Sequence, residues 1–271
     1  MANATEGSDT VSHRLLSIEL QQCTRLSAIL FSGPVEYIYN PLEYAYGMHS
    51  NFVHKFCTST KQILFLGMNP GPWGMSQTGV PFGEVKIVQD WLKITGHIGR
   101  PQKEHPSRQV LGLECKRSEV SGRKFWGLFQ NLCRDPDIFF QQAFVYNYCP
   151  LAFMTNSGKN ITPTELKASE RRLLNEICDK ALHDVLLLLQ VEMIVAIGKF
   201  AEARANSVVT GTELKGKIKI GSIPHPSPRN FSSKNWPEDT IKQLHELGIL
   251  TILGCRTHSV SQQQTWCTGK N

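Results

Sequence analysis

Two short polar segments, each directly after an apolar run, carry the residue types of this chain that are best suited to chemistry. They are Gly67-Met68-Asn69-Pro70-Gly71-Pro72 and His225-Pro226-Ser227-Pro228-Arg229-Asn230. Each segment places an amide or an imidazole on a rigid turn shaped by proline and glycine. In an open α/β sheet, ligands bind in the crevice beyond the carboxyl ends of the strands. The two turns could therefore meet in one pocket, and the sequence predicts an active site there.

Two further polar groups follow apolar runs in the same way. Asn147 comes directly after one run, and Gly198-Lys199 follows another. If the strands are parallel, all four polar groups lie along one edge of the sheet. This arrangement is more informative than any one of the motifs, because four strands would deliver polar groups to the same side.

Four apolar runs predict the buried strands that would position these groups. The runs are Ile63 to Leu66, Phe144 to Tyr146, Met193 to Ile197 and Ile218 to Ile223. Segments of helical periodicity separate them, with apolar faces at Val85, Val88, Trp91 and Leu92, and at Phe125, Phe129 and Leu132. Strands that alternate with helices predict an α/β fold, in which helices flank a central, mainly parallel, four-stranded sheet.

The sequence also predicts where two helices begin and end. Thr162-Pro163-Thr164-Glu165 has the pattern of a capping box with proline at the first helical position, and we expect it to open a long helix through Leu188. Asn235 to Leu247 predicts another helix, which Gly248 would end.

The composition is that of an ordinary folded domain. The chain has 271 residues, of which 41% are hydrophobic, and we expect one catalytic domain over residues 11–253. Residues 1–10 and 254–271 lack apolar periodicity, and we expect both tails to be disordered. The formal charge of +6 favours an anionic partner only weakly, because no run of five basic residues occurs.

Cysteine spacing and hydropathy exclude several other classes. The eight cysteines form no C-x-x-C pair, so we expect free thiols in a reducing intracellular compartment, and neither a metal nor another cofactor. No apolar run reaches membrane-spanning length, and no secretory signal is recognisable, so we expect no membrane partner. No oligomerisation signature is visible, and a monomer is expected.

The motifs together carry a resemblance to a known family. The first segment continues as Thr78-Gly79-Val80-Pro81-Phe82-Gly83-Glu84. With Asn147 and the segment that begins at His225, it resembles the uracil-DNA glycosylase superfamily, and within it the single-strand-selective monofunctional branch, from about Phe31 to Leu253. The resemblance implies a nuclear base-excision-repair enzyme. Such an enzyme flips uracil, 5-hydroxymethyluracil or another oxidised uracil out of single- or double-stranded DNA, and hydrolyses the N-glycosidic bond without cutting the strand.

The resemblance implies two catalytic residues. Asn69 would position the attacking water, and His225 would donate a hydrogen bond to O2 of the base as negative charge gathers there. The better-known uracil-specific branch has aspartate where this chain has Asn69. Because asparagine cannot act as a general base, the substitution implies a largely dissociative reaction. No motif places a lysine at C1′, so we expect no strand cleavage.

The resemblance also implies a base pocket. Phe82 would stack on the flipped base, Asn147 would bind the N3 and O4 edge of uracil, and the backbone amides of Met68 and Gly71 would add contacts. From the residues alone, simpler interpretations remain open: a core phenylalanine, an asparagine that caps a turn, and a structural histidine.

Two loops are candidates for contact with DNA. Ser157-Gly158-Lys159-Asn160 would bind phosphate at the start of the capped helix, although an ordinary solvated turn is the alternative. In the family, the loop after His225 is pushed into the base stack, and this assigns DNA contacts to Ser227, Pro228, Arg229 and Asn230. Arg229 would fill the space that the flipped base leaves.

Two other classes of function are alternatives to a DNA glycosylase. A DNA-binding module without chemistry would bind DNA but release no base. An enzyme acting on small nucleotides would place Gly198-Lys199 near a phosphate, but the chain lacks both the G-x-x-x-x-G-K-[ST] and the G-x-G-x-x-G motifs.

Overall fold

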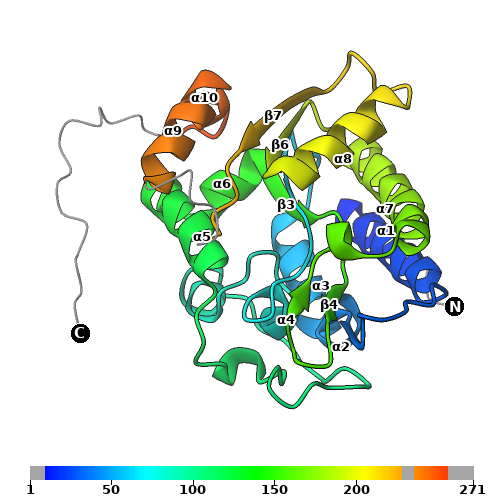
Figure 1. Ribbon diagram of the computed structural model, residues 1–271. Helices are drawn as coiled ribbons and strands as arrows, with labels where there is room; N and C mark the ends of the chain where they lie inside the picture. Colours follow the sequence, from blue (N-terminus) through cyan, green and yellow to red (C-terminus); the bar gives the residue numbers. More distant parts are fainter. Residues whose placement is uncertain (1–9, 228–234, 256–271) are drawn as a thin grey trace, which may run out of the picture.

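The computed structural model describes residues 10–227 and 235–255, and its centre is a four-stranded parallel sheet (Figure 1). The strand order is β3-β2-β6-β7, and every neighbouring pair is parallel. The bounds are β2 Ile63–Gly67, β3 Ala143–Asn147, β6 Met193–Ile197 and β7 Lys219–Ile223. All four predicted strands and the α/β class are thereby confirmed. Because the strands are parallel, their carboxyl ends lie at one edge of the sheet.

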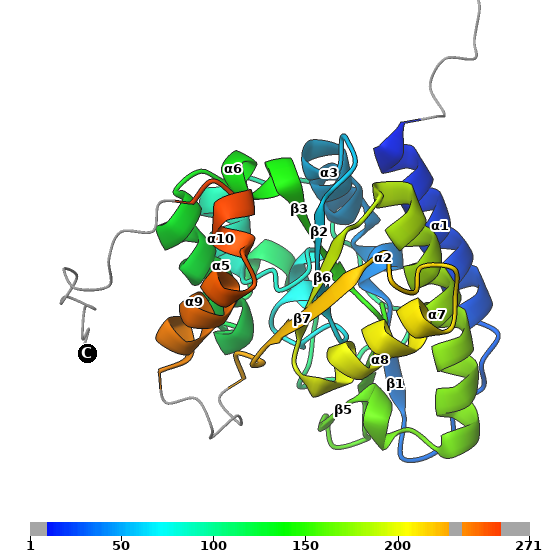
Figure 2. The same ribbon diagram turned by 90° about the horizontal axis from the view of Figure 1, so that it is seen from above.

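Helices cover both faces of this sheet (Figure 2). On one side lie α5 (Val120–Cys133), α6 (Pro136–Gln142), α9 (Trp236–Glu246) and α10 (Ile249–Ile252). On the other side lie α1 (Val11–Leu26), α7 (Ala168–Leu189) and α8 (Lys199–Thr210). Every residue of β2, β3 and β6 is buried, which explains why their sequences are continuous apolar runs.

An aromatic cluster fixes α5 and α6 against β2. The ring centroid of Phe65 lies 5.8 Å from that of Phe125, 5.2 Å from Phe129 and 5.3 Å from Phe139. Rings at these distances and tilts add directional contacts to the burial of apolar area. The cluster therefore places the start of α5 close to the carboxyl end of β2.

A second, antiparallel sheet lies beside the main one and was not predicted. It consists of β1 (Tyr37–Tyr39), β4 (Ala152–Met154) and β5 (Asn160–Ile161) in the order β1-β4-β5. Strands of two or three residues are too short to show alternation in the sequence. The remaining elements are α2 (Pro41–Tyr44), α3 (Tyr46–Phe56), α4 (Met75–Thr78), η1 (Ile87–Leu92), η2 (Gly112–Glu114) and η3 (Pro163–Glu165).

The predicted capping box forms, but the helix that it was expected to open does not begin there. The Glu165 carboxylate accepts a hydrogen bond from the Thr162 amide, and the box caps only the short 3-10 helix η3. Leu166 then adopts an extended backbone, with ψ 154°, and its side chain is buried in the core. The chain leaves the helical path at this point, and α7 starts separately at Ala168.

The other helix predictions are close to the structure. The apolar face at residues 85–92 is formed, although residues 87–92 are wound as a π-helix. Of the predicted face of α5, Phe125 and Phe129 are buried and Leu132 is half-buried. The helix predicted over residues 235–247 forms as α9, and Gly248 follows it with a left-handed φ of 73°. Among the described residues, no helix is long and apolar enough to cross a membrane. The seven cysteines in the described ranges are free thiols.

A buried ion pair ties α1 and α3 to the turn at Gly79. His49 Nε2 lies 2.8 Å from the Glu19 carboxylate, and His49 Nδ1 lies 2.9 Å from the Gly79 carbonyl oxygen. Both partners are acceptors, so both ring nitrogens donate only when His49 is protonated. Burial lowers the pKa of His49, but the Glu19 carboxylate and the two hydrogen bonds outweigh it, and the net pKa is raised above 6.5.

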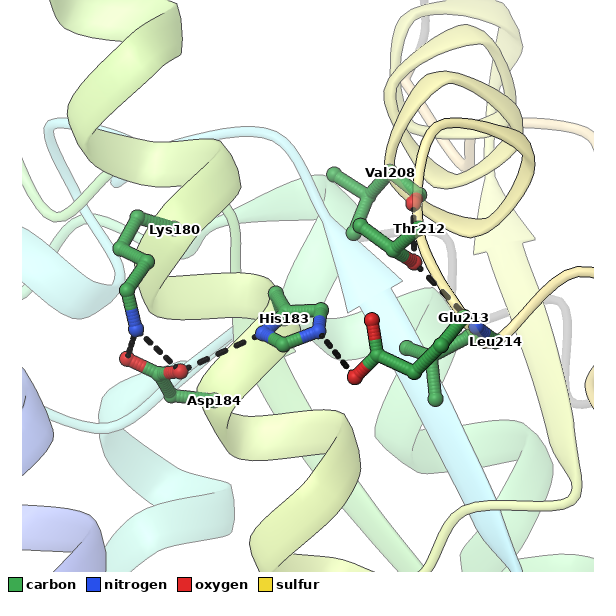
Figure 3. Close-up of polar contacts among 7 residues, drawn as sticks. All are labelled: Lys180, His183, Asp184, Val208, Thr212, Glu213 and Leu214. Carbon is green, nitrogen blue, oxygen red and sulfur yellow. Dashed lines mark hydrogen bonds and ion pairs between the residues drawn. The ribbon is translucent and has the colours of Figure 1, made fainter.

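A polar cluster attaches α7 to the connection that follows α8 (Figure 3). His183 lies between two carboxylates, with Nδ1 3.3 Å from Asp184 and Nε2 3.0 Å from Glu213. Lys180 pairs with Asp184 at 2.5 Å, and the Thr212 hydroxyl donates to the carbonyl oxygen of Val208. The cluster is remote from the carboxyl ends of the strands and stabilises the α7–α8 side of the fold.

Candidate active site

The segment after β2 is held against the segment after β3, and this fixes Asn69. The Tyr148 amide donates to the Gly67 carbonyl at 3.0 Å, and the Cys149 amide donates to the Met68 carbonyl at 2.9 Å. Asn69 Nδ2 then donates to the Leu151 carbonyl at 3.0 Å. Because a carbonyl oxygen can only accept, the Asn69 amide nitrogen must face Leu151. The Oδ1 atom of Asn69 is therefore turned away from Leu151 as an acceptor of fixed orientation.

Gly67 provides space for Asn147 and Phe82. The register of β2 and β3 sets Gly67 directly beside Asn147. A Cβ atom added to Gly67 would collide with Oδ1 of Asn147 and would lie 2.9 Å from Cε2 of Phe82. The amide and the edge of the aromatic ring thus meet over the end of β2. Asn147 Nδ2 also lies 3.1 Å from the sulfur of Met75.

Phe82 stands at the corner of a tight turn. Its φ is 53°, which is uncommon for a residue with a side chain and is often found at functional sites. The Gly83 amide donates to Val80 and the Glu84 amide donates to Phe82, each at 2.8 Å. The Phe82 ring stacks on Phe125 of α5, with centroids 4.8 Å apart and planes 23° apart. One face of the ring is therefore covered, and the ring is held as a rigid plate.

His225 enters the same region from the end of β7. Its ring centroid lies 6.3 Å from that of Phe82. A Cβ atom added to Gly198, after β6, would lie 3.1 Å from the His225 Cβ. The Ser227 amide donates to His225 Nδ1 at 3.1 Å, so Nδ1 is an acceptor. Burial lowers the pKa of His225, and the ring is neutral near pH 7 with its proton on Nε2. Nε2 is thus a neutral hydrogen-bond donor.

Comparisons with known proteins agree with this geometry. The family model described as the Uracil DNA glycosylase superfamily matches residues 54–247. The chain belongs to the uracil-DNA glycosylase superfamily. It is 47% identical over 245 residues to the single-strand selective monofunctional uracil DNA glycosylase of Mus musculus, covering 90% of this chain and 87% of the mouse protein. The protein of the same name in Bos taurus is 46% identical over 245 residues, covering 90% of this chain and 89% of the bovine one.

A solved structure from the superfamily has the same fold. The crystal structure of wild-type SMUG2 from Pedobacter heparinus superimposes with a TM-score of 0.63 at 17% sequence identity. The match covers 89% of this chain and 98% of the bacterial chain. At this identity the likeness concerns the fold.

The structure brings most of the predicted glycosylase pocket together. Asn147, Phe82 and His225 gather around Gly67 and Gly198, and Asn69 lies on the adjoining turn. Met68 and Gly71 lie on the same turn, where the Gly71 carbonyl accepts from the amide of Ser76 at 3.2 Å. The predicted DNA contacts Pro228, Arg229 and Asn230 fall outside the described residues.

The loop of Ser157, Gly158, Lys159 and Asn160 does not stand at the start of a helix, contrary to expectation. It closes the hairpin between β4 and β5, where Gly158 has a left-handed φ of 75°. The Thr155 amide donates to the Lys159 carbonyl at 3.0 Å, and the Lys159 amide donates to the Thr155 hydroxyl oxygen at 3.1 Å, which closes the turn. This loop therefore lacks the backbone amides of a helix N-terminus that were expected to bind a phosphate. Lys159 lies 3.8 Å from Glu165.

Lys199 does not join the site. Its side chain is 97% exposed and lies 3.6 Å from Glu202, one turn along α8. Gly198 instead backs the ring of His225. This removes the support for a phosphate site at Gly198-Lys199.

A basic and aromatic surface next to the site was not predicted from the sequence. Two arginines lie over the ring of Trp73, with the Cζ atoms of Arg108 and Arg117 5.1 Å and 4.5 Å from the ring centroid. Arg108 Nε also donates to the Gly158 carbonyl at 3.0 Å, so Arg108 links the β4–β5 hairpin to Trp73 in the turn after β2. A tryptophan beside glycines and prolines was the only sequence signal for this surface, because the two arginines come from a separate segment of the chain.

The presence of Glu119 at the site was also not predicted from the sequence. It directly precedes α5, and burial, with the nearby charge of Glu84, raises the pKa of its carboxyl group to about 7. Nothing in the local sequence distinguishes it from an exposed acidic residue at a helix start. Only the packing of α5 against the turn after β2 places it at the site.

Proposed function

We propose that this chain is a monofunctional uracil-DNA glycosylase that hydrolyses the N-glycosidic bond of a flipped uracil and leaves an abasic site. The observation that carries the proposal is the meeting of the Asn147 amide, the Phe82 ring and the His225 imidazole at the carboxyl ends of β2, β3 and β7. The relatives from mouse and cow, whose names state this activity, support it.

The Asn147 amide suits the edge of uracil. Its oxygen can accept the N3 hydrogen, and its nitrogen can donate to O4. Cytosine presents the reverse pattern, with an acceptor at N3 and a donor at C4. A pocket whose polar groups would be left unpaired by the wrong base discriminates strongly against that base. The Phe82 ring, fixed by Phe125, supplies an apolar plate on which the base can stack.

His225 suits the leaving group. As the N1–C1′ bond breaks, its electron pair moves into the base, and negative charge develops at O2. A neutral Nε2–H donor, oriented by the Ser227 amide, stabilises that charge without transferring a proton. Removal of one such donor costs about 3–4 kcal/mol of barrier, or about a hundredfold to a thousandfold in rate.

Asn69 suits the attacking water. Because Nδ2 donates to the Leu151 carbonyl, the Oδ1 atom of Asn69 is held in place as an acceptor. It can accept a hydrogen bond from a water molecule and thereby orient that water. An amide cannot take the proton. The water would therefore add to C1′ after the bond to the base has largely broken, when the sugar carries positive charge, and its proton would pass to solvent or to the departing base.

DNA would approach across the surface formed by Trp73, Arg108, Arg117 and the β4–β5 hairpin. Both arginines lie over the ring of Trp73, and Arg108 contacts the hairpin. Arginine side chains beside an aromatic ring are suited to phosphate and to unstacked bases. We include single- and double-stranded DNA as substrates, and a monomer as the active form.

We further propose that the substrate range includes 5-hydroxymethyluracil and other oxidised uracils, and that the protein acts in the nucleus. The basic pairs Lys116-Arg117 and Arg123-Lys124 are compatible with nuclear import. A fluorescent fusion of the full chain, compared with one in which both pairs are replaced by alanine, tests the location. Nuclear signal lost only in the variant would support import through these pairs, and a wild-type fusion confined to the cytoplasm would contradict it.

The activity is tested with an end-labelled oligonucleotide that contains one deoxyuridine, incubated with wild type or His225→Ala in chelator. We expect wild type to release uracil and leave a strand that breaks only after alkali, and the variant to lose about a hundredfold or more in rate. Binding without release of base would move the function to a DNA-binding module. Strand breakage before alkali would contradict a monofunctional enzyme.

A further inference from the structure

Two cysteine side chains from distant parts of the chain meet at the C-terminal end of α5. The sulfur of Cys133, the last residue of α5, lies 2.8 Å from the sulfur of Cys255, which follows α10. The two residues are 122 positions apart, and α5 and α10 lie on the same side of the sheet (Figure 2). A disulfide bond is about 2.05 Å long, so the two sulfurs need to approach by about 0.8 Å to form one.

A helix cap fixes the position of Cys255. Gly254 has a left-handed φ of 65°, and its amide donates to the Thr251 carbonyl at 3.0 Å. The Cys255 amide donates to the Leu250 carbonyl at 3.0 Å. This pair of bonds is the Schellman motif, which turns the residue after the glycine back against its own helix. Cys255 therefore belongs to the folded domain, and its side chain packs in the hydrophobic core.

The contact between the two thiols makes Cys255 the better nucleophile. A hydrogen bond from the Cys133 thiol lowers the pKa of the Cys255 thiol, and the same contact raises the pKa of Cys133. The thiolate, and not the thiol, is the reactive form of cysteine. Cys255 is also the more exposed of the two, at 8% against 3%. A small oxidant would therefore react first with Cys255, and the sulfur of Cys133 is in place for a second step.

Four other cysteines of the described ranges are less suited to oxidation. Burial raises the pKa of Cys23 and of Cys57 to about 12. Cys149 and Cys178 contact each other, but neither is exposed to solvent, and burial raises the pKa of Cys178 well above its usual value. Thiols with raised pKa values that solvent does not reach are inert.

We propose that Cys133 and Cys255 are a redox modification site, at which hydrogen peroxide forms a reversible disulfide that ties α10 to α5. The Cys255 thiolate attacks one oxygen of the peroxide, the O–O bond breaks, and hydroxide leaves, which gives a sulfenic acid. The Cys133 sulfur then attacks the Cys255 sulfur, the S–O bond breaks, and the oxygen leaves as water with the proton of Cys133. Two thiols and one peroxide thus give one disulfide and two waters, and the peroxide is reduced as the sulfurs are oxidised. Two molecules of a small thiol such as glutathione reverse the reaction by exchange.

The disulfide would join two helical segments that support the candidate active site. Phe125 of α5 stacks on Phe82. Trp236, the first residue of α9, donates from Nε1 to the Pro224 carbonyl at 2.8 Å, directly before His225. α9 in turn leads into α10. Because a bond that closes a long loop restricts the unfolded chain, the oxidised protein should withstand heat better than the reduced one.

The test uses the full chain, which is reduced, freed of reductant and incubated with hydrogen peroxide; N-ethylmaleimide then blocks the remaining thiols before digestion. We expect a peptide that links Cys133 to Cys255. We also expect the midpoint of thermal unfolding to rise by about 5–15 °C, the range for a disulfide that closes a long loop. Dithiothreitol should reverse both changes, and Cys255→Ser should show neither. Cys267→Ser is the matched control, because it removes a cysteine outside the described residues, and it should show both.

A wild type whose Cys255 stays reduced, or is oxidised only to sulfinic or sulfonic acid, would overturn the inference. A disulfide from Cys255 to a cysteine other than Cys133, or an equal rise in the midpoint of folded Cys255→Ser, would also overturn it. If Cys255→Ser does not fold, Cys133→Ala takes its place in the comparison. Both measurements are made without DNA, so failure here would leave the proposed uracil excision standing.

Discussion

Substitution of Gly67 by alanine tests whether the end of β2 positions the base pocket. Gly67 lies in a regular strand, so its backbone can accept a side chain, and the effect of a methyl group is steric. The new Cβ would lie 2.9 Å from Cε2 of Phe82 and still closer to Oδ1 of Asn147. Ordinary contacts begin at 3.4 Å, so the ring edge must move by about 0.5 Å and the amide by more.

The expected loss follows from this displacement. A misplacement of about 1 Å in a catalytic arrangement can cost about a hundredfold in rate. We therefore expect Gly67→Ala to slow single-turnover release of uracil by about thirtyfold to a hundredfold, which corresponds to about 2–2.7 kcal/mol of barrier. Both affected side chains can rotate away, so the protein should stay folded, and its thermal unfolding should remain cooperative.

Gly127→Ala is the matched control. Gly127 lies in α5, and a Cβ atom added there meets no atom within 4 Å. This change should leave the excision rate unaltered and stabilise the helix by about 0.5–1 kcal/mol. A folded Gly67→Ala variant that excises uracil within threefold of wild type would refute the reasoning that Gly67 makes room for the pocket.

Three further predictions concern single side chains. Asn69→Ala should reduce turnover by far more than it weakens binding to uracil-containing DNA, because it removes the acceptor fixed by Leu151; an equal loss in rate and in binding measured by titration would contradict this role. Asn147→Asp should slow uracil excision by about a hundredfold, the scale for loss of a specific polar contact, and should raise cytosine excision; unchanged uracil rates would exclude Asn147 from the pocket. His49→Gln should lower the free energy of unfolding most below pH 6.5, because the raised pKa of His49 means that its pairing with Glu19 is complete there and is lost as the pH rises through that pKa. Urea unfolding at several pH values checks this, and a difference between wild type and variant that grew with pH would refute it.

The main sheet was predictable because its strands are buried on both faces. Continuous apolar runs such as Met193–Ile197 mark such strands, and the structure begins and ends this one where the sequence predicts. The small antiparallel sheet was not predictable, because strands as short as Asn160–Ile161 carry no periodicity. For the same reason the hairpin that contains Lys159 was taken for a helix start.

The sequence by itself determined the family and the side chains that meet at the strand ends. Asn69, Asn147 and His225 follow directly after apolar runs, and parallel strands bring such positions to one edge whatever the details of packing. Their spacing along the chain is local information, which a sequence carries in full.

Only the tertiary structure decided how these groups are oriented and what surrounds them. The Leu151 carbonyl orients the amide of Asn69, and Arg108 joins the β4–β5 hairpin to Trp73 in the turn after β2. The carboxyl group of Glu119, which directly precedes α5, lies against Gly71 and Gly74 of the same turn. Each of these contacts joins segments that are distant in sequence. Their geometry depends on how helices pack against the sheet, and the spacing of residues within one segment does not record that packing.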